Sequence, residues 1–248
     1  MMFNTIVLAW IALAVVLMPV QLFVTAPYGR HARSGWGIGL PNRLGWFLME
    51  AVSLVLFAAL FLMGGSSKTA PMWIFFAAWI AHYANRSLIF PWRIRTRGKT
   101  MPLAIALGAA AFNVVNASLN GFYLGSLAHY SNAWLADPRF VIGALLFLLG
   151  AAINIVSDNR LIRLRSGDTK GYVVPRGGLF EWVSCPNLFG EIVEWAGFAV
   201  MCWNLPAFSF AVWTAANLVP RALSHHAWYR AHFADYPPAR RAVIPILL

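Results

Sequence analysis

Long apolar segments alternate with short polar ones along the whole chain of 248 residues. A helix that crosses a membrane needs about 20 mostly apolar residues, because the hydrocarbon core is about 30 Å thick and each helical residue rises about 1.5 Å. Seven segments approach this length, and the last two are shorter than the others. The pattern therefore predicts seven transmembrane helices, over residues 3–24, 44–64, 71–91, 102–125, 138–157, 188–203 and 205–221.

The composition supports this interpretation, since 60% of the residues are hydrophobic and only 11% are charged. A soluble domain of this length carries about a quarter charged residues. The predicted fold class is an all-α, polytopic membrane protein that forms a single membrane-embedded domain over residues 1–248. Two cysteines, Cys185 and Cys202, do not make a disulfide framework or a zinc site, and we expect no metal.

The formal net charge of +11 does not indicate nucleic-acid binding, because the basic residues do not cluster on a soluble module with interleaved aromatic residues. They mark the topology instead. Apart from Lys68 and Arg139, every lysine and arginine lies near the end of the first, third, fifth or seventh segment or in the loop that follows it. The positive-inside rule then predicts an N-terminus outside and a cytoplasmic C-terminus.

Polar residues gather between positions 154 and 195, where the flanking segments are apolar. Polar groups at membrane depth cost several kcal/mol unless they are paired or used. The segment therefore predicts a functional site. Its acids and neighbouring amides are Asn154, Asp158, Asp168, Glu181, Asn187, Glu191 and Glu194.

A basic run, Arg160, Arg163 and Arg165, follows the fifth segment. The ordinary interpretation of such a run is attraction to anionic lipid headgroups. For Arg165 we favour a role in binding a ligand, since arginine forks suit the phosphates of a dinucleotide.

Glu50 lies inside the second predicted helix, about 9 Å from its cytoplasmic edge at about 1.5 Å per residue. A carboxyl group at that depth is either protonated or paired. Tyr83 of the third helix lies at a similar depth, so a hydrogen bond between the two is geometrically possible. The fourth helix carries three asparagines on one face, Asn113, Asn116 and Asn120. They would either line a pocket or form hydrogen bonds between helices.

The segment Tyr172–Trp195, with the sequence YVVPRGGLFEWVSCPNLFGEIVEW, closely resembles the C-terminal signature of the steroid 5α-reductase family. The resemblance includes NIVSD at residues 154–158, RALSHHAWY at 221–229 and DYP at 235–237. It covers the C-terminal hundred residues well and the N-terminal half in patches. Residues 1–125 would then serve mainly the substrate and residues 138–248 mainly the cofactor.

The resemblance implies NADPH as the cofactor. No G-x-G-x-x-G motif follows a strand, so the membrane helices and their loops would hold the dinucleotide. The resemblance implies contacts to NADPH from Tyr28, Arg30, Asn154, Asp158, Arg165, Tyr172, Asn187, Glu191, His225, Tyr229 and Arg240. It implies catalytic roles for Glu50 and Tyr83, while Met49, Asn113 and Asn116 are candidate substrate contacts.

The implied reaction is reduction of the Δ4 double bond of a 3-oxo-Δ4-steroid, or of another apolar enone. The family carries a glutamine where this chain has Met49, which makes a changed substrate more plausible. The alternatives are an enoyl-thioester or polyprenol reductase of the same superfamily, an isoprenylcysteine-type membrane methyltransferase, and a transporter or ligand-binding protein. The expected surroundings are a lipid bilayer, either a bacterial inner membrane or a eukaryotic endoplasmic reticulum, without a required protein partner.

Overall fold

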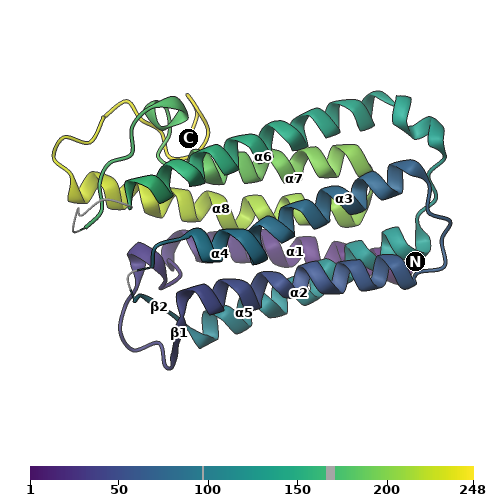
Figure 1. The fold of residues 1–248 in the computed structure, drawn as a ribbon, viewed down its shortest axis with the longest axis horizontal. Helices are drawn as coiled ribbons and strands as arrows, with labels where there is room; N and C mark the ends of the chain where they lie inside the picture. The colour runs from purple at the N-terminus through teal and green to yellow at the C-terminus, as the bar shows by residue number, and fades with distance from the viewer. Residues whose placement is uncertain (97, 166–170) are drawn as a thin grey trace. The chain divides into compact units, whose positions relative to one another are not determined.

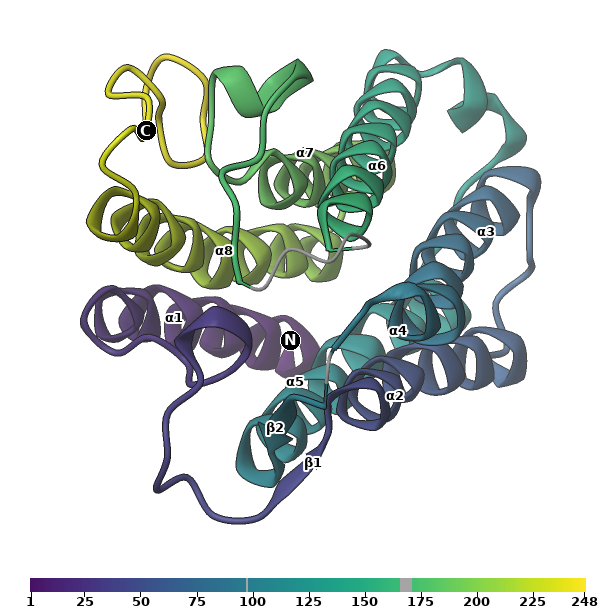
Figure 2. The same ribbon diagram turned by 60° about the vertical axis from the view of Figure 1, so that its left-hand side comes forward.

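The computed structural model describes residues 1–96, 98–165 and 171–248. Arg97, Asp168 and Lys170 lie outside the described residues. The described chain is mostly helical, and it divides into two compact units (Figures 1 and 2). The first unit contains residues 1–25 and 142–248, and the second contains residues 26–141.

The first unit is built on the helices α1 (Met2–Phe23), α6 (Pro138–Leu164), α7 (Pro186–Cys202) and α8 (Leu205–His232), with the short helix η5 (Gly178–Glu181). The N-terminal helix α1 packs against α8. The rings of Trp10 and Trp213 lie 4.6 Å apart, and Trp213 Nε1 donates to the Trp10 carbonyl oxygen at 2.9 Å. The first predicted span therefore joins the C-terminal helices rather than the segments that follow it.

Glycines set the distance between α6 and α7, which run antiparallel. A Cβ added to Gly150 would lie closer than 3.0 Å to the backbone of Gly190 and Glu194. The same holds for Gly143 against the backbone around Gly197. Because each pair of glycines is spaced seven residues apart, both contacts fall on one face of each helix. The two backbones consequently approach as closely as small residues allow.

The second unit contains α2 (Asn42–Met63), α3 (Ala70–Ala84), α4 (Phe90–Arg93) and α5 (Leu103–Phe122). Two strands, β1 (Gly39–Pro41) and β2 (Thr100–Pro102), pair antiparallel just before α2 and α5. The short helices are η1 (Gly29–His31), η2 (Asn85–Ile89), η3 (Tyr123–Leu127) and η4 (Asn132–Ala136), of which η2 and η3 are π-helices.

α2 and α5 run in the same direction and pack through small residues. Gly121 meets the backbone of Phe57, and Gly125 meets the backbone of Leu60. At the far end, Lys68 Nζ donates to the carbonyl oxygens of Gly64 and Gly125, both at 2.9 Å. These carbonyls lie where helices end and lack helical partners, so one ammonium group satisfies both helix ends.

The seven predicted helices all form, but several boundaries differ from the prediction. The third predicted helix ends as α-helix at Ala84 and continues as the π-helix η2. The last one, predicted to end at residue 221, continues to His232. The two short strands and both π-helices were not predicted, because they depend on local pairing that apolar periodicity does not report.

Among the described residues, four helical segments are long and apolar enough to cross a membrane, by length and composition: Met2–Phe23, Asn42–Met63, Leu103–Leu127 and Pro138–Leu164. Spans by α3, α7 and α8 and the orientation of the termini remain predictions. Large apolar side chains on the four segments face outward, for example Val16 at 66% and Leu148 at 64% exposed. An outward apolar face is what a helix in contact with lipid requires.

Candidate active site

α6 and α7 hold a network of amide and carboxylate side chains. Asn154, which is 2% exposed, donates from Nδ2 to the Asn187 carbonyl oxygen at 3.0 Å and lies 3.5 Å from Glu191 Oε2. Asn187 Nδ2 in turn donates to Asp158 Oδ1 at 3.0 Å. Gly190 makes this possible, because a Cβ there would strike the Asn154 backbone. The structure thus brings four predicted cofactor residues together; their role in binding stays a prediction.

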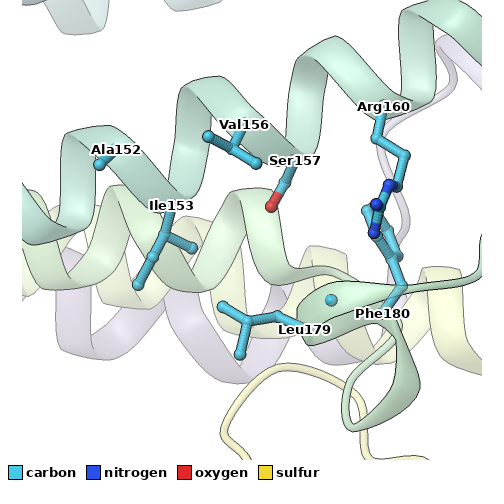
Figure 3. Close-up of a pocket in the computed structure, with 8 residues that line it drawn as sticks. Ala152, Ile153, Val156, Ser157, Arg160, Leu179 and Phe180 are labelled. Atoms are coloured by element: carbon cyan, nitrogen blue, oxygen red, sulfur yellow. The ribbon is translucent and has the colours of Figure 1, made fainter.

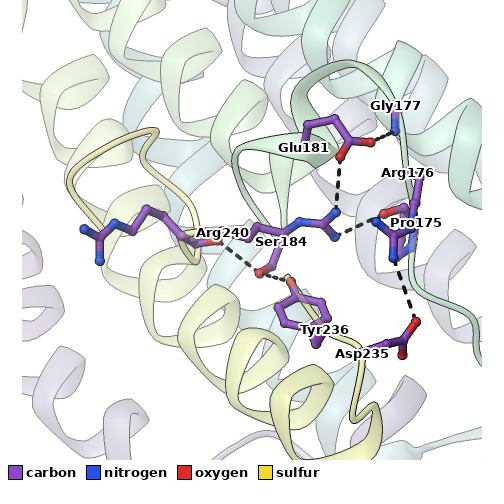
Figure 4. Close-up of polar contacts among 9 residues, drawn as sticks. Pro175, Arg176, Gly177, Glu181, Ser184, Asp235, Tyr236 and Arg240 are labelled. Carbon is purple, nitrogen blue, oxygen red and sulfur yellow. Dashed lines mark hydrogen bonds and ion pairs between the residues drawn. The ribbon is translucent and has the colours of Figure 1, made fainter. Parts of the chain in front are cut away.

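Arg240 is buried near the C-terminus, with its guanidinium only partly hydrogen-bonded (Figure 4). Its Nη1 donates to the Pro175 carbonyl oxygen at 3.1 Å, and its Nη2 lies 3.8 Å from Glu181 Oε2. Its Nε and Nη2 find no hydrogen-bond acceptor within the described residues. Since a guanidinium carries five donors, this group retains donors for an anionic ligand.

Ser184 connects the segment before α7 to the C-terminal segment (Figure 4), and it also contacts His226 of α8. Its hydroxyl donates to the Arg241 carbonyl oxygen at 3.0 Å. The hydroxyl has one proton, so it accepts from both of its other partners, the Tyr236 hydroxyl and His226 Nδ1, each at 2.6 Å. This arrangement assigns the Nδ1–H tautomer to His226, and it holds the backbone beside Arg240 in place.

Tyr172 and Arg165 lie together beside α8. The Arg165 guanidinium lies 5.6 Å from the Tyr172 ring, and that ring meets Trp228 edge to face at 5.0 Å. Arg165 is exposed and Tyr172 is half-buried. The exposed cation is therefore positioned by aromatic packing rather than by burial.

Tyr229 and His225 come from the last turns of α8. Tyr229 is 2% exposed and stacks on Tyr236, with the ring centroids 5.4 Å apart. His225 is half-buried one turn before it. All of the predicted cofactor residues except Tyr28 and Arg30 thus belong to the first unit.

The predicted substrate residues belong to the second unit. Asn113 Nδ2 donates to the Met49 carbonyl oxygen at 2.7 Å, so its amide connects α5 to α2. This is the helix–helix hydrogen bond that was one of the two interpretations of these asparagines. Asn120 Nδ2 donates to the Asn116 carbonyl oxygen at 3.0 Å. Asn116 is fully buried, and its Nδ2 has no acceptor in the part of the chain that the structure describes.

Glu50 shares a face of α2 with Trp46, one turn earlier. The guanidinium of Arg86 lies 5.0 Å from the Trp46 ring and 4.7 Å from the Phe90 ring. Tyr83 precedes Arg86 by three residues and is 3% exposed. Trp46, on the face of α2 that carries Glu50, thus contacts the residues directly after α3, and a hydrogen bond between Glu50 and Tyr83 stays a prediction.

The helix that carries Tyr83 changes to a π-helix directly after it. Ser87 Oγ donates to the Tyr83 carbonyl oxygen at 2.6 Å within this π-turn. π-Turns occur frequently at functional sites, where they re-aim side chains. Tyr28 meets Trp46 edge to face at 6.5 Å, and Arg30 lies in η1 directly after it.

Arg86, Ser184 and Tyr236 were not predicted as site residues. The signal for Arg86 was present, because an arginine inside a predicted span is costly unless it is used. Ser184 and Tyr236 lie within the motifs that carry the resemblance, but neither residue was given a role. Their importance comes from a contact between residues far apart in the chain, which spacing does not reveal.

The pKa of His226 is lowered from its ordinary value of 6.5, first by burial and then by the charges of Arg230, Arg240 and Arg241. The folded chain therefore favours the neutral ring, and the unfolded chain binds a proton at this histidine more readily. The free energy of unfolding is consequently highest above pH 6.5 and decreases as the pH falls from 6.5 through the lowered pKa. We expect a lower melting temperature at pH 5.5 than at pH 7.5. His226→Gln should reduce this difference, whereas His129→Gln, at an exposed position, should preserve it. An unchanged pH dependence in His226→Gln would contradict the assignment.

The fold and these contacts define a helical membrane protein with buried cationic and carboxylate groups. The family model described as 3-oxo-5-alpha-steroid 4-dehydrogenase matches residues 99–248. The chain is 44% identical over 243 residues to 3-oxo-5-alpha-steroid 4-dehydrogenase 1 of Bos taurus, which covers 96% of this chain and 93% of the relative.

Two further relatives support the same assignment. The human 3-oxo-5-alpha-steroid 4-dehydrogenase 1 is 42% identical over 224 residues, covering 89% of this chain and 85% of that protein. Steroid 5-alpha-reductase DET2 of Arabidopsis thaliana is 40% identical over 235 residues, covering 91% and 88%. The chain therefore belongs to the 3-oxo-5-alpha-steroid 4-dehydrogenase family, whose members are oxidoreductases acting on a CH–CH group.

The similarity extends further than the motifs alone indicate, because it includes the N-terminal half. These relatives come from animals and plants, so they lend no support to a bacterial inner-membrane location.

Proposed function

We propose that this protein reduces the Δ4 double bond of 3-oxo-Δ4-steroids to 5α-dihydrosteroids, with NADPH as the reductant. The observation that carries the proposal is the 44% identity to a 3-oxo-5-alpha-steroid 4-dehydrogenase over 96% of the chain. Seven membrane spans and a cytoplasmic C-terminus form part of the same proposal.

The residues of the first unit fit an anionic dinucleotide. Arg240 keeps buried donors without acceptors in the described chain, which suits a phosphate oxygen. Arg165 and Tyr172 offer an exposed cation beside an aromatic ring. The amide and carboxylate network offers acceptors and donors for hydroxyl groups. NADPH would supply the hydride that is transferred to C5 of the steroid.

Glu50 and Tyr83 activate the substrate carbonyl in this proposal. As hydride reaches the carbon β to the carbonyl, negative charge develops on the oxygen. A protonated Glu50 and the Tyr83 hydroxyl each donate a hydrogen bond to that oxygen, as in an oxyanion hole. Such a donor is worth about 3 kcal/mol of the barrier because it is already oriented before charge develops.

The test is NADPH oxidation by the purified full chain in detergent with testosterone, followed by mass analysis of the steroid. We expect consumption of NADPH and a product heavier by two hydrogen atoms. 5α-Dihydrotestosterone serves as the matched control, since it has the same carbonyl but no Δ4 bond. Binding of NADPH without turnover of any 3-oxo-Δ4-steroid would contradict the proposed substrate and favour an enoyl or polyprenyl one. A chain that binds S-adenosylmethionine and not NADPH would contradict the reductase altogether.

A further inference from the structure

An apolar groove lies between α6 and the short helix η5 (Figure 3). Its volume is about 300 Å³, and it opens to the surroundings. On a helical projection its α6 residues lie opposite Asn154 and Asp158, which point at α7. The lining residues are Ala152, Ile153, Val156, Ser157 and Arg160 of α6, with Gly178, Leu179 and Phe180 of η5.

The groove continues an exposed apolar stripe along α6. Leu145, Leu148 and Val156 are 63%, 64% and 64% exposed, and helical spacing places them on one side. α6 is one of the four segments able to cross a membrane. The stripe is therefore the part of α6 that lipid acyl chains would cover, and the groove lies at its C-terminal end.

Arg160 closes the polar end of the groove. Its guanidinium lies over two glycines of the η5 turn: a Cβ on Gly177 would lie 2.8 Å from Arg160 Nη1, and one on Gly178 would lie 3.0 Å from it. Only glycine leaves this space, and both glycines have a positive φ that favours the residue further. Within the described ranges Arg160 has no ion pair or hydrogen bond, so its donors are available.

The charge around the groove is positive. Arg163, one turn after Arg160 on the same side of α6, is also exposed. The acid of the η5 turn, Glu181, is already used, since it accepts a hydrogen bond from Gly177 N and lies near Arg240. A ligand with an aliphatic chain for the groove and an anionic head for the arginines would match both features.

We propose that this groove binds an anionic phospholipid, with one acyl chain between Val156 and Leu179 and the phosphate at Arg160. Arginine suits phosphate oxygens because its planar fork can donate two parallel hydrogen bonds. A neutral steroid would leave Arg160 without a counter-charge, and free phosphate would leave the apolar walls uncovered. The site lies on the opposite side of α6 from the network proposed to hold the cofactor.

The test compares phosphatidylglycerol with phosphatidylcholine of identical acyl chains, added to the full chain in detergent. Native mass spectrometry counts the bound lipids, and thermal unfolding gives the stabilisation. We expect phosphatidylglycerol to bind and stabilise more than phosphatidylcholine. Arg160→Gln should weaken phosphatidylglycerol binding by roughly tenfold, the loss expected for one charge-assisted contact. Arg33→Gln, which removes an exposed arginine of the other unit, should leave binding unchanged.

A second variant tests the apolar wall. Val156→Trp fills the groove while it keeps Arg160, and the larger side chain starts from a position that is 64% exposed, outside the packed core. We expect it to weaken the binding of phosphatidylglycerol, because the indole would occupy the space proposed for the acyl chain. Equal binding of both lipids, or equal stabilisation by inorganic phosphate alone, would overturn the proposal. Retention of phosphatidylglycerol binding in both variants would overturn it as well.

Discussion

Glu50→Leu is expected to lower kcat with a 3-oxo-Δ4-steroid by about 10²- to 10³-fold, because it removes one of two proposed donors to the developing oxyanion. Leucine matches the apolar surroundings of α2, so the helix should form as before. The affinity for NADPH should be unchanged, since Glu50 is not among the residues proposed to hold the cofactor. Single-turnover reduction of the steroid and a separate NADPH titration measure the two quantities.

Glu50→Gln is the informative partner of this variant, because its amide still donates a hydrogen bond. We expect it to retain much of the activity that the leucine variant loses. Val55→Ala, on the same helix with a 65% exposed side chain, is the control for the effect of substituting α2 at all. If both Glu50 variants reduced the steroid at the wild-type rate, the carbonyl-activating role would be wrong.

The helices were predictable because apolar length is a direct physical requirement of a membrane span. Their pairing was not. The sequence places Asn154 and Asp158 on one face of their helix, but it does not say that Asn187 donates to Asp158. That contact depends on an antiparallel approach of α6 and α7, which the glycines at heptad spacing permit.

The asparagines of α5 show how far spacing carries a functional argument. Their common face was expected to line a pocket or to form hydrogen bonds between helices; all three are buried, yet they differ in what they do. Asn113 uses its amide between helices, whereas Asn116 retains a buried donor that has no acceptor in the described chain. The spacing of these asparagines therefore predicts that they share a face. Which amide is available to a ligand depends on whether the neighbouring helix offers it a hydrogen-bond partner.

Arg86 is a residue whose importance the sequence did indicate, because it is a charged side chain inside a predicted span. The prediction explained it only as a cytoplasmic charge. Counting it among the cytoplasmic cations explained its charge and removed the reason to ask for a partner. In the fold it is 8% exposed and lies over two aromatic rings, beside the helix face that carries Glu50. A cation inside a predicted span has to be explained by its own contacts as well as by the positive-inside rule.

Gly150→Ala is expected to cause a large loss of stability, because it adds a methyl group where α6 meets the backbone of α7. The new Cβ would lie closer than 3.0 Å to the backbone of Gly190 and Glu194, so the two helices would have to separate. Overpacking against backbone costs about 3 kcal/mol or more, because no side chain can rotate away. Separation would also lengthen the contacts of Asn154 with α7, so NADPH affinity should fall together with the melting temperature.

Gly108→Ala provides the matched control, since it makes the same substitution in a helix with no atom within 4 Å of the new Cβ. There the methyl group reduces backbone freedom in the unfolded chain and should stabilise by about 0.5 to 1 kcal/mol. In thermal unfolding in detergent, the melting temperature should therefore fall for Gly150→Ala and rise for Gly108→Ala, each relative to the unsubstituted protein. Equal melting temperatures would mean that α6 and α7 do not approach through their glycines, and the geometry of the polar network would need another cause.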